Sequence, residues 1–193
     1  MKQNQQTLRQ RLIDGTIRII SRDGLEKATT KLIGTETAIN EAYIYRCFAD
    51  KEDMFAKTFD ALDEELFNKV MQNIFVMYRT EMTYEERCWT FFSSLWRFFL
   101  DSPEKSITYI RYFHSPHFDN TSMAEHRVRF EPLITKLYDA FRDETNVEML
   151  LYHILITMMG FAKQVFNGAV PDNNDTAEHV FRLLFAAARQ YFR

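Results

Sequence analysis

The chain has few of the residues that break or cross-link a backbone: five glycines, four prolines and two cysteines among 193 residues. Cys47 and Cys88 have no paired spacing, which excludes a disulfide framework and a cysteine-based zinc motif. Scarce glycine and proline favour helices with short connections, and no stretch shows the alternation of apolar and polar residues that is typical of a strand. The sequence therefore predicts an all-α fold.

Long apolar runs are also lacking. Residues 1–11 are polar and do not contain the apolar segment of a signal peptide. The longest apolar run, residues 149–162, is interrupted by His153 and Thr157. It is shorter than the roughly 18–20 residues that a membrane span needs. These features predict a soluble, cytoplasmic protein with no membrane partner.

Charge of one sign is not in large excess. The formal net charge is −3, but residues 1–48 contain eight Lys or Arg and five Asp or Glu, so the N-terminal segment is positive and the remainder negative. The sequence contains no Gly-rich phosphate loop, no nucleophile elbow and no facing pair of carboxylates. We therefore expect neither an enzyme nor a bound cofactor.

Residues 29–55 carry the pattern of two short helices joined by a tight turn and followed by a third helix. Leu32 and Ile33 lie on the apolar face of the first helix. Asn40 suits the N-cap of the second, because its side chain accepts a hydrogen bond from an otherwise unpaired backbone N–H. Asp50 caps the third, with acidic residues in the first turn where the helix dipole favours them. Helix, turn and helix form the DNA-binding motif whose second helix enters the major groove.

Six short features of this stretch, at constant spacing, resemble the DNA-binding domain of the tetracycline-repressor (TetR) family. They are Gly24, Thr29-Thr30, Ile33-Gly34, Thr37-Ala38-Ile39, Tyr45-Arg46-Cys47-Phe48 and Lys51-Glu52. The resemblance implies a helix-turn-helix domain at residues 1–49, joined by a long helix to a helical regulatory and dimerisation domain at residues 50–193. It also implies a ligand-responsive transcriptional regulator, usually a repressor, that binds a palindromic double-stranded DNA operator as a homodimer and is released by a small apolar or aromatic effector.

Three residues depart from the family pattern. Ala38 replaces the turn glycine, and Gly34 stands where alanine is usual. Because a non-glycine residue at positive φ costs about 1 kcal/mol, we expect a slightly reshaped turn. Glu41 repels phosphate, although its carboxylate accepts a hydrogen bond from cytosine N4. These departures keep an alternative open, namely a co-activator or protein-interaction module that uses the same fold without direct DNA binding.

The predicted DNA contacts combine basic and aromatic side chains with hydroxyls at a helix N-terminus, a position suited to phosphate. The predicted residues are Thr29, Thr30, Lys31, Asn40, Glu41, Ala42, Tyr43, Tyr45, Arg46 and Lys51. The resemblance implies that Thr29, Tyr45 and Lys51 contact the DNA backbone. It places Asn40, Glu41 and Tyr43 at the base edges. The alternative for Tyr45 and Phe48 is simple core packing.

The rest of the chain has helical periodicity, including one helix predicted over residues 50–79. Aromatic residues between positions 89 and 113 are more numerous than a small bundle needs, and apolar walls with a few polar groups are typical of a small-molecule pocket. The predicted effector-binding residues are Phe92, Trp96, Phe99, Tyr109, Tyr112 and Phe113. The alternative for each of them is ordinary core packing.

Residues 149–162 are apolar on nearly every side, and such a helix needs burial all round. We expect this helix and the last one to form a two-fold dimer interface. The predicted interface residues are Ile154, Leu155, Met158, Val180, Leu184, Ala187 and Ala188. The spacing of His114, His117 and His126 matches no strong zinc pattern, so no metal site is predicted.

Overall fold

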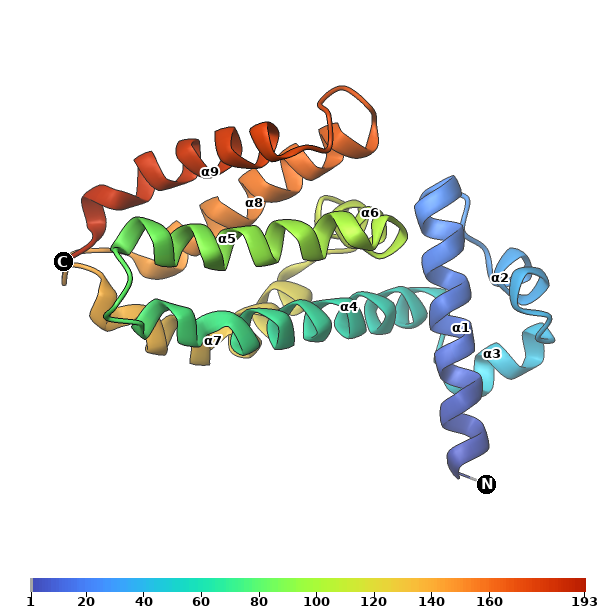
Figure 1. Cartoon of the computed structure of the whole chain (residues 1–193). Helices are drawn as coiled ribbons and strands as arrows, with labels where there is room; N and C mark the ends of the chain where they lie inside the picture. The colour runs from blue at the N-terminus through green and yellow to red at the C-terminus, as the bar shows by residue number, and fades with distance from the viewer. Residues whose placement is uncertain (1) are drawn as a thin grey trace. The chain divides into compact units, whose positions relative to one another are not determined.

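The computed structural model describes residues 2–193, with side chains from Gln6 onward, and this part of the chain confirms the all-α prediction (Figure 1). Nine α-helices and three short 3-10 helices lie within it. Their bounds are α1 Lys2–Asp23, α2 Thr30–Thr37, α3 Glu41–Cys47, α4 Lys51–Asn73, η1 Ile74–Tyr78, α5 Tyr84–Asp101, α6 Pro103–Phe113, α7 Asn120–Leu137, η2 Tyr138–Ala140, α8 Val147–Phe166, α9 Asn174–Ala188 and η3 Arg189–Tyr191.

The long helix predicted over residues 50–79 ends earlier than expected. Regular α-helix stops at Asn73, and a 3-10 segment follows to Tyr78. The Asn73 side chain donates a hydrogen bond to the Lys69 carbonyl at 2.7 Å. Asparagine offers the backbone such local alternatives to the helical ladder, which explains the break.

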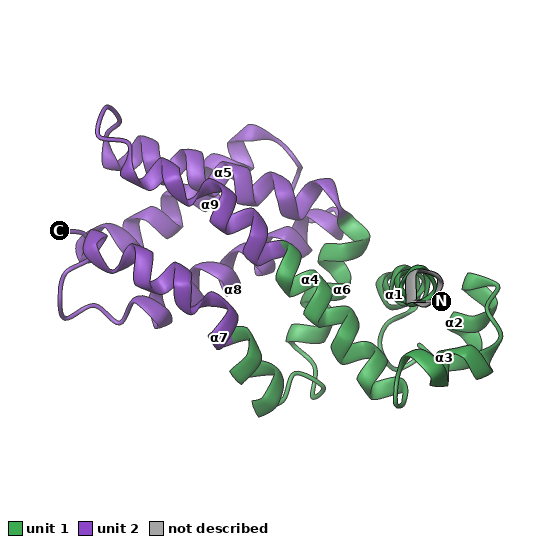
Figure 2. Ribbon diagram, turned by 90° about the horizontal axis from the view of Figure 1, so that it is seen from below, with its two compact units in different colours: residues 1–65, 103–126 green, residues 66–102, 127–193 purple. Residues whose placement is uncertain are grey.

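The chain forms two compact units (Figure 2). Unit 1 contains the residues up to Glu65 together with Pro103–His126, and unit 2 contains Leu66–Ser102 and Arg127–Arg193. Packing thus groups α6 with the N-terminal helices, because the Thr108 hydroxyl donates to the Ile17 carbonyl at 3.0 Å and Arg111 donates to the Ile20 carbonyl. The division into functional domains at residues 1–49 and 50–193 stays a prediction.

An aromatic cluster fills the part of unit 1 that lies beyond the helix-turn-helix. The Phe59 ring stacks on Tyr109 and Tyr112, with ring centroids 4.9 Å and 4.7 Å away. Asp63 is completely buried beside this cluster. Its Oδ1 accepts a hydrogen bond from the Tyr109 hydroxyl at 2.9 Å and lies 2.9 Å from Nδ1 of His126. A buried carboxylate therefore joins α4, α6 and α7 within unit 1.

In unit 2, α5, α8 and α9 pack side by side (Figure 1). Trp96 on α5 is almost fully buried, and Phe92 stacks on it and packs against Phe181 of α9. Thr83 begins α5 with a capping box, in which its hydroxyl accepts from the Glu86 N–H and the Glu86 side chain bonds back to the Thr83 backbone. Unit 2 therefore has its own apolar core.

The helix α8 leaves much of its apolar surface exposed. Among the described residues, α8 is the one helix that is long and apolar enough to cross a membrane, judged by length and composition only. In its most apolar 18-residue segment, 22% of the residues are buried. The whole helix has 20 residues and so extends beyond the apolar run 149–162, but length and composition alone do not distinguish a membrane span from a core helix. This composition is also that of a helix with a protein interface, because both environments favour apolar side chains.

Candidate nucleic-acid interface

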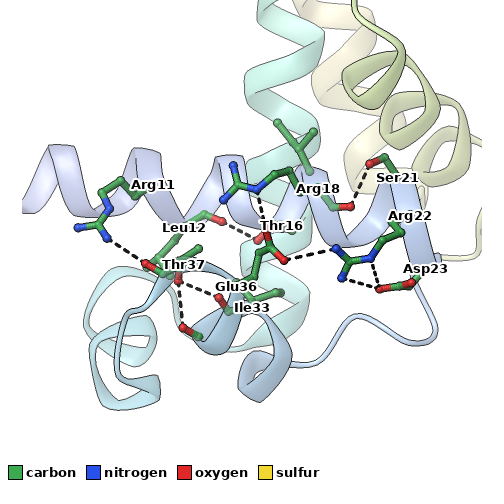
Figure 3. Close-up of polar contacts among 12 residues, drawn as sticks. Arg11, Leu12, Thr16, Arg18, Ser21, Arg22, Asp23, Ile33, Glu36 and Thr37 are labelled. Atoms are coloured by element: carbon green, nitrogen blue, oxygen red, sulfur yellow. Dashed lines mark hydrogen bonds and ion pairs between the residues drawn. The ribbon is translucent and has the colours of Figure 1, made fainter.

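The two N-terminal helices α1 and α2 are held together by polar contacts around Glu36 (Figure 3). Nε of Arg18 donates to the Glu36 carboxylate at 2.8 Å, and Arg22 approaches it at 3.4 Å. The hydrogen bond from Arg18 lowers the pKa of Glu36, so this carboxylate stays charged between the two arginines. Arg11 donates to the Thr37 carbonyl at 2.9 Å, which satisfies an acceptor at the end of α2. The first helix thus fixes the position of the second.

The turn after α2 has a left-handed conformation at Ala38, the residue that replaces the turn glycine of the family pattern. Ala38 has φ 52° and ψ 39°, and its N–H bonds back to the carbonyls of Gly34 and Thr35. A Cβ added at Gly34 would lie 2.8 Å from the carbonyl oxygen of Ile39. The two departures from the family pattern therefore depend on each other. The turn at Ala38 brings the Ile39 carbonyl close to residue 34, and only glycine at position 34 leaves room for it.

We expect opposite effects from exchanging these two residues one at a time. Ala38→Gly should stabilise the protein by about 1 kcal/mol, because glycine adopts the left-handed region without the Cβ clash. Gly34→Ala should destabilise it by about 1–3 kcal/mol, because a backbone carbonyl cannot move aside as a flexible side chain does. Urea unfolding of both single variants checks this expectation. Equal stability of Gly34→Ala and the unmodified protein would show that the turn is more adaptable than its geometry indicates.

The helix α3 is anchored on one side and open on the other. Ile44 is completely buried, and Phe48, just after the helix, is buried under the guanidinium of Arg9, whose carbon lies 5.5 Å from the ring centroid. Asn40 caps the helix as predicted, since its side chain accepts from the Ala42 N–H at 2.9 Å. One stripe of α3 is thus fixed in the core of unit 1, and the remaining stripes face solvent.

The exposed side of α3 carries half of the predicted DNA contacts. Tyr43 and Tyr45 have exposed fractions of 45% and 56%, which are large values for tyrosine. Tyr45 is therefore not a core residue, whereas Phe48 is. The Arg46 guanidinium lies over the Tyr43 ring, 4.7 Å from its centroid, so these two side chains form one surface feature.

The other predicted contacts are also at the surface. Thr29, Lys31, Asn40, Glu41 and Ala42 are exposed, and Thr30 and Lys51 are half-buried. Thr29 caps α2, where its hydroxyl oxygen accepts from the Leu32 N–H at 3.2 Å. Nζ of Lys51 lies 3.5 Å from the Glu52 carboxylate. The ten residues thus lie on α2, on α3 and at the starts of α2, α3 and α4, all within unit 1.

The predicted effector-binding residues divide between the two units. Phe92, Trp96 and Phe99 are buried on α5 in unit 2, and Tyr109, Tyr112 and Phe113 are buried on α6 in unit 1. Unit 2 also has an open cavity of about 370 Å³ at the start of α5, beside α9. Its lining residues are Thr83, Glu85, Glu86, Trp89, Glu178, Phe181 and Arg182. This cavity was not predicted from the sequence, although Trp89, which lines it, is an aromatic neighbour of Phe92.

The predicted dimer residues also form two groups. Met158, Val180, Leu184 and Ala188 are buried within unit 2 of a single chain, so their side chains are core residues rather than surface ones. Ile154, Leu155 and Ala187 are half-buried. The large exposed apolar side chains of the same helices are Met149 and Leu183, with exposed fractions of 67% and 59%. The 3.6-residue periodicity could not fix which side of each helix faces solvent, and the interface on these helices stays a prediction.

Asp63 and its partners were missed in the sequence. The available signal was its position four residues after Phe59, on the buried stripe of α4. A carboxylate on such a stripe implies buried hydrogen-bond partners, because an unpaired charge would be too costly there. His126, one of the three histidines whose spacing matches no strong zinc pattern, is one of these partners.

The histidine, cysteine and acidic side chains are also candidates for metal ligands, and the two cysteines for reactive thiols. No group of three or more His, Cys, Asp or Glu residues is placed there to hold a metal ion. Burial raises the pKa of the Cys47 thiol, and raises that of Cys88 to about 11. Both thiols are thus less reactive than a free cysteine, since the thiolate is the reactive form.

The surface described above lies on a helix-turn-helix, which is formed by α2, the turn at Ala38 and α3. Residues 12–58 match the family described as "Bacterial regulatory proteins, tetR family". This match covers α2, the turn and α3, so the N-terminal part of the chain has the sequence of a TetR-family DNA-binding domain.

Two curated relatives match the N-terminal part of the chain. The HTH-type nicotine-responsive transcriptional repressor HdnoR of Paenarthrobacter nicotinovorans is 35% identical over 66 residues, which are 34% of this chain and 32% of the relative. The nucleoid occlusion factor SlmA of Pasteurella multocida is 35% identical over 54 residues, 28% of this chain and 27% of the relative. The chain therefore matches only about a third of the length of these proteins.

The whole chain resembles solved structures in fold. A TetR family transcription regulator from Marinobacter aquaeolei VT8 has a TM-score of 0.79 and 16% sequence identity, with 97% of this chain and 98% of that chain covered. At this identity the likeness shows a shared fold alone. The shared fold covers nearly the whole chain, from the N-terminal helices to α9.

Proposed function

We propose that the protein is a transcriptional repressor that binds a palindromic DNA operator as a homodimer in the cytoplasm and is released by a small effector. The observation that carries this proposal is α3, which buries Ile44 and exposes Tyr43, Tyr45 and Arg46 on a positively charged N-terminal segment. A helix of this kind fits the major groove, and basic and hydroxyl groups around it contact phosphates.

The dimer rests on the exposed apolar surface of unit 2. On α8, Met149 is largely exposed, Ile156 is half-buried, and a Cβ added at Gly160 would meet no atom within 4 Å. On α9, Leu183 is exposed. Apolar residues with a small residue between them suit close packing against the same helices of a second copy. Two-fold pairing also matches a palindromic operator, whose half-sites lie about one DNA turn apart.

The effector is proposed to be an apolar or aromatic compound that binds near the aromatic residues of α5 or α6. A compound changes DNA affinity only if it binds the DNA-competent and DNA-released states unequally. The helix α4 contains residues of both compact units, which makes it the proposed carrier of this difference. The alternative of a co-activator without direct DNA binding is separated from a repressor by gel-shift assays with the DNA that flanks the gene.

We expect Lys51→Ala and Tyr45→Phe to weaken binding to all DNA sequences about equally. Each variant removes a proposed phosphate contact, and phosphate contacts carry no base information. For Lys51→Ala, the slope of log affinity against log salt should fall by about one unit. Anisotropy titrations with operator and random duplexes at several salt concentrations measure both quantities. A change in operator preference with Lys51→Ala would assign this side chain to a base edge instead.

The two tryptophans of α5 provide a test of the effector site, because Trp96 is buried and Trp89 borders the open cavity. A panel of aromatic compounds should quench the tryptophan fluorescence of the protein. Trp96→Phe should remove that quenching and leave DNA binding unchanged, whereas Trp89→Phe should retain it. Quenching that disappears only with Trp89→Phe would move the site to the cavity lined by Trp89 and Phe181.

A further inference from the structure

The starts of the two helices of the helix-turn-helix are joined by a side-chain hydrogen bond. Thr30 is the first residue of α2 and Glu41 is the first residue of α3. The Thr30 hydroxyl donates to Oε1 of the Glu41 carboxylate. Thr30 is half-buried and Glu41 is exposed, so this contact lies on the side of the motif that is proposed to face DNA.

The chemistry of a hydroxyl limits what Thr30 does in this arrangement. A threonine hydroxyl has one proton to donate, and a phosphate oxygen only accepts. While the proton of Thr30 is donated to Glu41, it is not available to a phosphate. The neighbouring Thr29 differs, because its oxygen accepts from the Leu32 N–H and its own proton remains to donate. Thr29 is thus the better phosphate contact of the pair.

The hydrogen bond also determines where the Glu41 carboxylate lies. Glutamate has a long side chain with several rotatable bonds, and ordering it during binding would cost affinity. Thr30 holds one carboxylate oxygen in advance, and the carboxylate keeps further acceptor positions on its second oxygen. In the major groove, the amino group at N4 of cytosine is the donor that Glu or Asp side chains accept from.

We propose that Thr30 is a positioning residue that holds the Glu41 carboxylate to accept from a cytosine amino group in each operator half-site. This inference rests on the proposed function, since it requires that the protein reads DNA. It assigns a role to the acidic residue that otherwise only repels phosphate. It also gives Thr29 and Thr30 different roles, although they are adjacent and chemically identical.

The experiment selects preferred sites from a random pool of DNA duplexes, with the full-length protein and a set of matched variants. Thr30→Val removes the hydroxyl at nearly constant shape, and Thr30→Ser keeps it. Glu41→Gln replaces the carboxylate by an amide. Thr29→Ser keeps the neighbouring cap and serves as a control. Thermal unfolding of each variant confirms that the domain is folded under the binding conditions.

The unmodified protein should select a palindrome with a cytosine at one position of each half-site. Thr30→Val should lose about ten-fold of the preference for that cytosine and keep the other positions, because only the Glu41 contact is disturbed. Thr30→Ser and Thr29→Ser should keep the preference. Glu41→Gln should shift it to another base, with adenine favoured because an amide pairs with its N6 and N7.

Two results would overturn the inference while leaving the proposed function intact. The first is that Thr30→Val weakens binding to all sequences equally and leaves the selected site unchanged, which would make Thr30 a phosphate contact. The second is that the selected site contains no cytosine whose preference is lost or changed in Glu41→Gln, which would contradict the contact proposed for Glu41. If the unmodified protein enriches no sequence at all, the proposed function fails, and the inference fails with it.

Discussion

Replacing Leu184 by aspartate is expected to unfold unit 2, whereas the same replacement at the neighbouring Leu183 is expected to keep the fold and split the dimer. Leu184 is 5% exposed and Leu183 is 59% exposed, although they are adjacent on α9. An aspartate at position 184 would be buried without a partner, at a cost of about 4 kcal/mol or more. The pair thus separates a core position from a surface position with one chemical change.

The consequences for DNA binding follow from the loss of two-fold symmetry. With Leu183→Asp, the sedimentation coefficient should fall to that of a monomer while the circular dichroism spectrum is retained. Operator affinity should fall by roughly a hundred-fold or more, because the second half-site is no longer bound by a linked partner. Leu183→Ala is the control and should change both quantities much less. A Leu183→Asp protein that sediments as a dimer would place the interface on another surface.

The second large effect is expected at the buried carboxylate of unit 1. Tyr109→Phe removes a hydrogen bond at 2.9 Å to the completely buried Asp63. The buried Oδ1 then keeps His126 as a neighbour but loses the hydroxyl donor, and the free energy of unfolding should fall by about 1–3 kcal/mol. Urea unfolding measures this difference.

A double-mutant cycle identifies the cause of that loss. Asp63→Leu together with Tyr109→Phe removes both the buried acceptor and its donor, so it should restore part of the stability that Tyr109→Phe alone loses. Phe59→Leu, which alters the same aromatic cluster without touching the carboxylate, controls for packing. Additive effects of Asp63→Leu and Tyr109→Phe would show that the hydrogen bond contributes little.

Local signals in the sequence predicted the N-terminal part of the fold well. Asn40 caps α3, Ala38 takes the left-handed turn position, and Phe48 is buried as its place in the motif indicates. These outcomes depend on residues close in sequence, where propensity and capping dominate. Core packing was one of two interpretations of Tyr45, and the exposed side chain excludes it, whereas the DNA contact stays a prediction.

The parts that escaped prediction depend on contacts between residues far apart in the chain. The packing of α6 on α1 rests on Thr108 and Arg111, which bond to carbonyls 91 residues away. The burial of Leu184 and the exposure of Leu183 depend on how α9 is rotated against α5 and α8, and both rotations place apolar residues inward. The Thr30–Glu41 contact required the turn geometry as well as the two residue types.

The most direct test of the account is binding to the DNA upstream of the protein's own gene, measured against random duplexes of equal length at physiological salt. The account predicts a protected palindromic segment and an affinity at least about a thousand-fold above that for random DNA. Tyr45→Phe and Lys51→Ala should lower both affinities together. Equal affinity for upstream and random DNA, or no binding to either, would contradict the account and favour a protein-interaction module that uses the same fold.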